Sequence, residues 1–297
     1  VILRSLRGSW FRTVILSALV AISVNFQIVN SFDYRIAWTT QQEFQWQLYR
    51  RVPDARPNTA FLGDAIIASF MGGWADGAMV LEMYGKSAGV NPTPYWYFVI
   101  GEGDYAAEFD YKLPLTHLVK IYNFRSEFGD NIVLTKPEWD RCLWVLDDLD
   151  RYNPYISDVT KGLIQYGNPA RIVYDSEWQL DEGMFGSEGP RDWCYAYESG
   201  AASAAQGKYE EALAYYAEAE ANAWSIRRPV ELTPFIRAAA LTGDWAKAAE
   251  LTKRASWEPH ITYEYFAHLW NELFASTEDS PARAAAFQSV LPFVTSE

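Results

Sequence analysis

One apolar segment near the amino terminus constrains this chain more than any other feature. Residues 10–29 (WFRTVILSALVAISVNFQIV) are predominantly apolar, with Arg12, Asn25 and Gln27 as interruptions. A membrane-spanning helix needs about 20 such residues. Further arginines precede the segment, and the positive-inside rule therefore predicts a cytoplasmic amino terminus with the rest of the chain outside. We expect residues 10–29 to anchor the chain in a membrane, with its bulk periplasmic or extracellular.

Two other interpretations of this segment stay open. A signal peptide has the same charged start, but it needs a small-residue cleavage site, and SVNFQIVNSF offers none that fits well. A buried helix of a soluble protein is the third interpretation, because several serine, asparagine and glutamine residues weaken the apolar signal. The chain starts with Val1, so we expect a processed chain, a fragment or a sequence whose true start is missing.

Composition excludes some classes of protein. A chain of 297 residues can hold one large or two ordinary domains and bury a core. An apolar content of 49% excludes a disordered acidic chain. The formal net charge is −13, and such a surface repels phosphate backbones, so we expect no nucleic-acid partner.

The middle region, residues 33–190, predicts an α+β domain. Ile36–Arg51 contains no proline or glycine and should form a helix that Pro53 ends. TAFLGD, YWYFVI and RCLWVLDD have the composition of short strands. LVKIYNFRSEF and IVLTK flank Gly129–Asn131, which predicts a hairpin with its turn there. A mixture of strands, helices and hairpins is typical of the α+β class.

No group of residues predicts a reaction. Asp147, Asp148 and Asp150 follow a predicted strand, where carboxylates often bind metals or transfer protons. The three histidines (117, 260 and 268) are scattered, so we interpret the acidic group as a solvent-exposed turn. The sequence also lacks a GxSxG elbow and a phosphate-binding loop. We therefore expect no catalytic residue, metal site or cofactor, and we favour a non-enzymatic function.

Residues 191–297 predict helical hairpins similar to tetratricopeptide repeats. Two helix pairs break at Gly207 and Gly243, and the offset of 36 residues is close to the repeat length of about 34. In this pattern small residues let two helices approach and aromatic residues fill the gap. Two units are fewer than an independent array usually needs, so this region should lean on the α+β region. A plain all-α bundle without a binding function is the alternative.

Aromatic residues of these helices are the candidates for an interaction surface. Tryptophan and tyrosine suit a surface that is apolar on one side and faces water on the other, because each has an apolar ring and a polar group. The candidate contact residues are Tyr195, Tyr209, Tyr216, Trp224 and Trp245. Most repeat aromatics pack inward, so we expect some of these to belong to the core.

Several segments together resemble a known family. They are WTTQQEFQWQLYRRVPDARPNTAFL, CLWVLDD, GNPARI, DWCYAYESGAASAAQGKYEEA and TPFIRAAALTGDWAKAAELTKRA. The chain resembles, from Trp38 to Ala255, the carboxy-terminal extracytoplasmic region of bacterial polytopic membrane proteins. The membrane part of those proteins looks like an integral-membrane glycosyltransferase of the lipid-linked-sugar type. The resemblance implies that the first helix is the last transmembrane helix and that the catalytic acids lie in earlier loops.

The resemblance also bears on the two cysteines. The family holds a cysteine at the positions of Cys142 and Cys194, which implies a disulfide bond in an oxidising compartment. From the residues alone the alternatives are one disulfide outside the cytoplasm or two buried thiols inside it.

The sequence thus predicts an anchor (1–32), an α+β domain (33–190) and a tetratricopeptide-like domain (191–297). The leading interpretation is a membrane-anchored extracytoplasmic scaffold, a protein-interaction subunit of a membrane or envelope complex. The alternative is the non-catalytic end, or an accessory subunit, of an integral-membrane glycosyltransferase.

Overall fold

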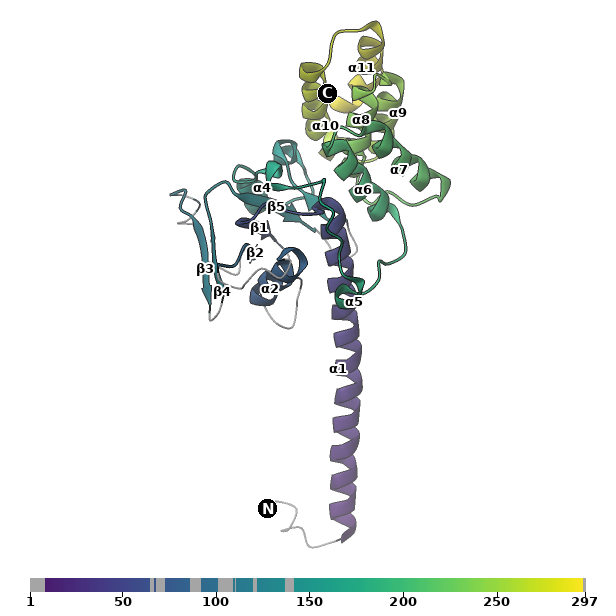
Figure 1. The fold of residues 1–297 in the computed structure, drawn as a ribbon. Helices are drawn as coiled ribbons and strands as arrows, with labels where there is room; N and C mark the ends of the chain where they lie inside the picture. Colours follow the sequence, from purple (N-terminus) through teal and green to yellow (C-terminus); the bar gives the residue numbers. More distant parts are fainter. Residues whose placement is uncertain are drawn as a thin grey trace.

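A computed structural model describes residues 9–64, 67, 73–85, 92–100, 109, 111–119, 122–136 and 142–295. The chain forms a long helix, a sheet body and a stack of helices (Figure 1). The elements of the first two parts are α1 (Ser9–Arg51), β1 (Thr59–Gly63), α2 (Gly73–Tyr84), β2 (Tyr95–Val99), β3 (Leu115–Val119), β4 (Tyr122–Ser126), β5 (Asn131–Thr135), β6 (Trp144–Val145), α4 (Asp158–Ile164) and α5 (Glu182–Phe185). The helical stack contains α6 (Trp193–Ala205), α7 (Tyr209–Ala221), α8 (Thr233–Leu241), α9 (Trp245–Ala255), α10 (Pro259–Ser276) and α11 (Pro281–Val294).

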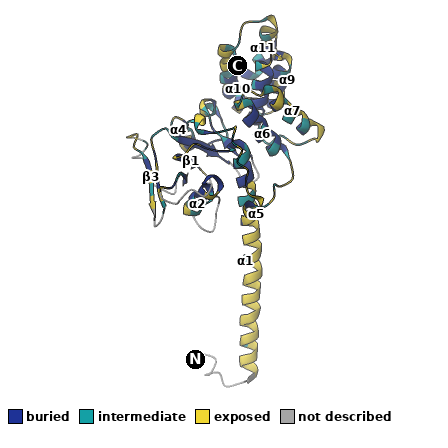
Figure 2. Ribbon diagram, viewed as in Figure 1, coloured by how far each residue is buried: buried dark blue, intermediate teal, exposed yellow. Residues whose placement is uncertain are grey.

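Helix α1 joins the apolar segment to the folded part without a break. It is 43 residues long, and no proline or glycine interrupts it. Its first half projects away from the rest of the molecule with its side chains exposed, and Ala37 is its first buried residue (Figure 2). Among the described helices, α1 alone is long and apolar enough to cross a membrane. The interpretation as a core helix is not supported, because the apolar segment is exposed and buries none of its surface against the residues that the structure describes, and membrane anchoring is favoured.

The sheet body is built on parallel strands. The strand order is β2-β1-β5-β6, in which β1 pairs in parallel with both β2 and β5, and β6 is antiparallel to β5. Every residue of β1, β2 and β5 is buried, as expected for parallel strands that are covered on both faces. A separate hairpin, β3–β4, stands beside this sheet. The prediction of an α+β fold is confirmed.

The two faces of the sheet contribute to two hydrophobic cores. Successive side chains of a strand point to opposite faces. Phe61 of β1 faces a core that includes the second half of α1 and helix α2. Its neighbours Ala60 and Leu62 face the other core, which continues through the β3–β4 hairpin and α4 into the helical stack. The stack and the body therefore share one core rather than meeting at a thin linker.

The predicted hairpin around Gly129–Asn131 is wrong. Strand β4 pairs with β3, whereas β5 lies in the central sheet beside β1. The burial of all of β5 explains the difference, because a strand without an exposed face gains most from a central position. Gly129 has a φ of +88°, so a turn is present there, but it connects two different sheets.

The helices of the stack pack as neighbours along the chain, α6 with α7, α8 with α9 and α10 with α11 (Figure 1). Helices α6 and α8 end in the same way. Gly207 and Gly243 have positive φ, and the residue after each glycine donates its backbone N–H to a carbonyl five positions earlier. This is the Schellman ending, which favours glycine because it needs the left-handed conformation. The two predicted breaks are thus equivalent turns, and the likeness to tetratricopeptide repeats stays a prediction.

Candidate interaction site beside helix α1

One face of α1 holds the segment that leads into the helical stack. The Gln42 side chain donates to the carbonyl of Ser187 at 2.6 Å, and Trp46 Nε1 donates to the carbonyl of Gly186 at 3.2 Å. One turn further on, Arg50 pairs with Glu188 at 2.8 Å. Positions 42, 46 and 50 follow the four-residue spacing of a single helix face. The helix that carries the apolar segment therefore also fixes residues 186–188.

Gly186 makes this close contact with α1 feasible. Its φ is +75°, a region that side chains with a Cβ rarely adopt. A Cβ atom at this position would lie 2.4 Å from Gln42 Nε2. The backbone conformation requires glycine here, and a larger residue would also displace the Gln42 amide from its hydrogen bond to Ser187.

A groove of about 550 Å³ lies between this face of α1 and residues 187–192. We call it the juxtamembrane groove; its lining residues are Thr39, Gln42, Glu43, Trp46, Gln47, Arg50, Ser187, Glu188, Gly189, Pro190, Asp192, Cys194 and Arg227. Gln47 is buried, and its Oε1 atom has no hydrogen-bond partner in the described structure. Buried amide oxygens are nearly always paired, so a bound molecule with an N–H or O–H donor would suit this atom.

A cluster of aromatic rings adjoins the groove. Tyr195 packs edge-on against Tyr215 at 5.9 Å and against Trp224 at 6.4 Å between ring centroids. All three side chains are half-buried. The guanidinium of Arg191 lies 4.4 Å from the Tyr195 ring centre, and that of Arg50 lies 5.7 Å away. Half-buried aromatics next to arginine are the residue types enriched at protein interfaces. We call these rings the Tyr195 cluster.

An ion pair and a disulfide bond fix the sheet body to the helical stack next to the groove. The Glu198 side chain of α6 is fully buried, and it accepts from Arg50 at 2.8 Å and from the Leu143 backbone N–H at 3.1 Å. Burial raises the pKa of the Glu198 carboxyl, and the Arg50 guanidinium offsets part of that effect. A disulfide bond joins Cys142 to Cys194 beside this ion pair, with 5.0 Å between their Cα atoms. Covalent and ionic links thus hold α1, residues 142–143 and α6 together.

The structure separates the predicted contact residues into two groups. Tyr216 and Trp245 are 2% and 6% exposed and pack in the core, against Phe235 and Trp270 respectively, so they offer no surface to a partner. Tyr195, Tyr209 and Trp224 keep part of their surface exposed.

The sequence interpretation missed the charged residues of the site. Glu198 lies within a helix of small and aromatic residues, and Arg50 comes from another domain of the prediction. A charged residue inside an otherwise buried helix face was the available signal, because such a charge needs a partner.

The acidic turn differs from the expected solvent-exposed arrangement. Asp147 caps the short 3₁₀ helix Asp148–Tyr152 and pairs with Arg237 at 2.9 Å. Asp148 is exposed, but Asp150 is half-buried, and the loss of hydration around it, followed by the charge of Asp147, raises its carboxyl pKa to about 7. Among the described residues, no three His, Cys, Asp or Glu side chains are placed to hold a metal ion.

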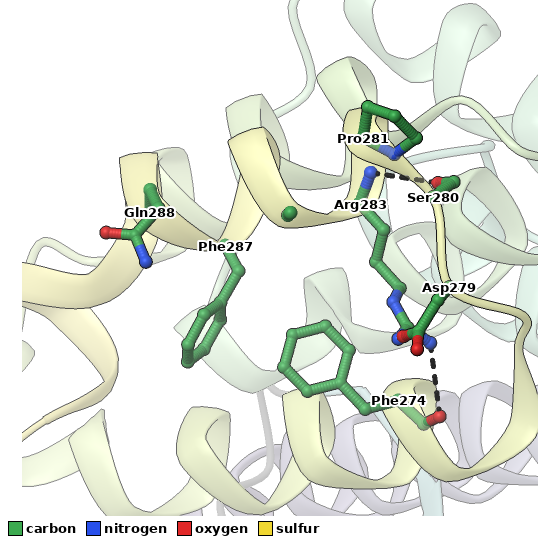
Figure 3. A pocket seen from close by; sticks show the side chains of 8 residues that line it. Phe274, Asp279, Ser280, Pro281, Arg283, Phe287 and Gln288 are labelled. Carbon is green, nitrogen blue, oxygen red and sulfur yellow. Dashed lines mark hydrogen bonds and ion pairs between the residues drawn. The ribbon is translucent and has the colours of Figure 1, made fainter.

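A second surface pocket, of about 500 Å³, lies between α10 and α11 (Figure 3). Arg283 crosses it, stacks over Phe274 at 4.9 Å, and donates to the Thr277 carbonyl at 2.7 Å while pairing with Asp279. The arginine therefore fastens the turn into α11 and leaves little polar capacity for a ligand.

Comparison of the chain with known protein families, curated protein sequences and solved structures finds no match. The family resemblance stays a hypothesis, and the site is argued from its geometry alone.

Proposed function

We propose that this protein is a membrane-anchored extracytoplasmic interaction subunit of a membrane or envelope complex. The juxtamembrane groove and the Tyr195 cluster together would form the contact surface for a partner protein. The main support for this proposal is that α1 belongs to two parts of the molecule. Its apolar half is exposed, and its face around Trp46 lines the groove. A partner bound there is held at a fixed position relative to the membrane.

The chemistry of the groove favours a protein partner. Gln47 offers an unpaired acceptor for a backbone N–H, and the neighbouring rings offer apolar area with little conformational entropy to lose. The charged groups of the groove are paired within the chain, including Arg50 with Glu188 and Arg227 with Asp192 at 3.5 Å. A partner would therefore bind by shape, hydrogen bonds and aromatic contacts more than by net charge.

Site-specific photocrosslinking in native membranes tests this proposal. A photoreactive phenylalanine analogue replaces Tyr195 in one variant and Val159 in a control variant, since Val159 is an exposed residue of α4, in the sheet body. We expect a discrete crosslinked band of defined mass at position 195 and none at position 159.

Two results would speak against the proposal. One is the absence of any crosslink at position 195 although the variant is made and inserted normally. The other is an equal pattern of bands at both positions, which would mean contact by random collision.

A further inference from the structure

The two arginines that end α1 have contrasting surroundings. Arg50 is paired with two carboxylates. Arg51 is 9% exposed, and among the described residues no carboxylate lies within ion-pair distance of it. Its Nη2 donates to the Val145 carbonyl at 3.4 Å, and its Nε has no hydrogen-bond partner. A buried guanidinium without an anion is costly, so this site lacks a counter-charge.

Arg51 borders a pocket of about 190 Å³ at the junction of the sheet body and the helical stack. We call it the junction pocket. The ring of Tyr197 lies under the guanidinium, with 5.6 Å from Arg51 Cζ to the ring centre, and gives it a partial cation–π contact. The far wall comes from α8 and α10 through Arg237 and Tyr265. The pocket is separate from the juxtamembrane groove, because the two share no lining residue.

When Asp150 is protonated, the charge of the junction pocket that no carboxylate of the described residues offsets is that of Arg51. Arg237 also lines the pocket, but it pairs with Asp147 at 2.9 Å and with Glu272 at 2.7 Å. Burial raises the carboxyl pKa of Asp150 to about 7, so this group is largely neutral below that pH. Burial also raises the pKa values of the Tyr197 and Tyr265 hydroxyls, which therefore carry no charge.

We propose that the junction pocket binds a small anion, carrying a phosphate or carboxylate group, that pairs with Arg51. Phosphate and carboxylate are the anions whose geometry matches a guanidinium. The volume limits the ligand's size, because a cavity of about 150 Å³ holds a molecule as large as benzene. The ligand would touch residues of the body and of the stack at once, and its binding would stabilise the junction between them.

Thermal unfolding of the full chain in detergent micelles tests this inference. Tryptophan fluorescence follows unfolding in sodium phosphate, in sodium acetate and in sodium chloride of matched ionic strength at pH 6. A ligand at about ten times its Kd should raise the Tm by roughly 3–6 °C. The comparison of phosphate with acetate identifies which anion the pocket prefers. At pH 8 the rise should be smaller, because ionised Asp150 then repels the anion.

Variants locate the effect. Arg51→Met should abolish the anion-dependent rise and leave the Tm in chloride equal to or above that of the native chain, because an unpaired buried charge has been removed. Ala204→Leu fills part of the pocket from α6 while Arg51 is kept, and it should abolish the rise as well. Arg125→Met, a change at an exposed arginine of β4, is the matched control and should keep the full rise.

Three outcomes would overturn the inference. They are no rise with either anion beyond that in chloride, a rise that persists in Arg51→Met, and a rise that persists in Ala204→Leu. Where Arg51→Met fails to fold, the Ala204→Leu result decides. None of these outcomes bears on crosslinking at position 195, so the two proposals fail independently.

Discussion

Replacing Arg50 with methionine would leave the Glu198 carboxylate buried without its cation. The Glu198 side chain has 0% exposure and the Arg50 side chain 13%, so water does not replace the lost partner. The Leu143 N–H would remain as one hydrogen-bond donor. Breaking a buried ion pair by removing one partner costs about 3–5 kcal/mol. We expect a loss of that size in the free energy of unfolding at pH 8.

The pH dependence of this loss distinguishes charge burial from lost packing. Burial already raises the pKa of the Glu198 carboxyl above its ordinary value, and removal of Arg50 raises it further. A carboxyl with a raised folded pKa destabilises the fold as pH rises through the window between its unfolded and folded pKa values. The penalty in Arg50→Met should therefore be larger at pH 8 than at pH 5, because protonation of Glu198 relieves it as the pH falls.

Urea unfolding of the full chain in detergent, followed by tryptophan fluorescence, measures both effects. Arg125→Met is the matched control, because Arg125 and Glu127 form a pair with side chains 63% and 68% exposed, which contributes at most about 1 kcal/mol. The double variant Arg50→Met/Glu198→Gln should recover part of the loss, since position 198 then carries no buried charge. The reasoning fails if Arg50→Met costs no more than the control, or if its cost is the same at pH 5 and pH 8.

Three further predictions follow from packing, redox state and burial. Gly200→Ala should lower the free energy of unfolding by about 1–3 kcal/mol, because a Cβ there would lie 2.4 Å from a phenylalanine ring of α8. Gly162→Ala, with open space around it, should stabilise α4 by up to about 1 kcal/mol. Urea unfolding of the two variants measures both changes. Thiol alkylation before lysis should leave Cys142 and Cys194 unlabelled in cells, and free thiols there would contradict an extracytoplasmic position. Burial raises the carboxyl pKa of Glu231 to about 7, so the free energy of unfolding should fall by up to about 3 kcal/mol as the pH rises from about 4.5 to 7. Glu231→Gln should flatten this dependence of stability on pH. Equal slopes in the variant and the native chain would refute the prediction.

Local pattern predicted most elements of this fold. The apolar runs TAFLG and YWYFV are strands, and the helix predicted to end before Pro53 ends at Arg51. The two predicted breaks at Gly207 and Gly243 are real helix ends, because the left-handed backbone that glycine favours is a local property.

Long-range pairing was not predictable in the same way. The strand IVLTK follows good turn residues, and nothing local shows that it pairs with β1 across 70 residues instead of with its neighbour. Charge pairing shares this limitation. Arg50 and Arg51 are adjacent and chemically identical in the sequence, yet a helix turns by about 100° per residue and presents them to different surroundings. One meets two carboxylates, and the other meets a tyrosine ring and a pocket.

Because α1 is one unbroken helix, it fixes the distance between the apolar segment and the groove. A helix rises 1.5 Å per residue, so Thr39 stands about 15 Å beyond the end of the apolar segment at Val29, and Arg50 about 32 Å beyond it. No glycine or proline lets the helix bend to change this spacing. In the proposed interaction, a partner embedded in the same membrane would have to present its binding segment between these two positions along α1. The length of α1 would then select partners by how far they project from the bilayer.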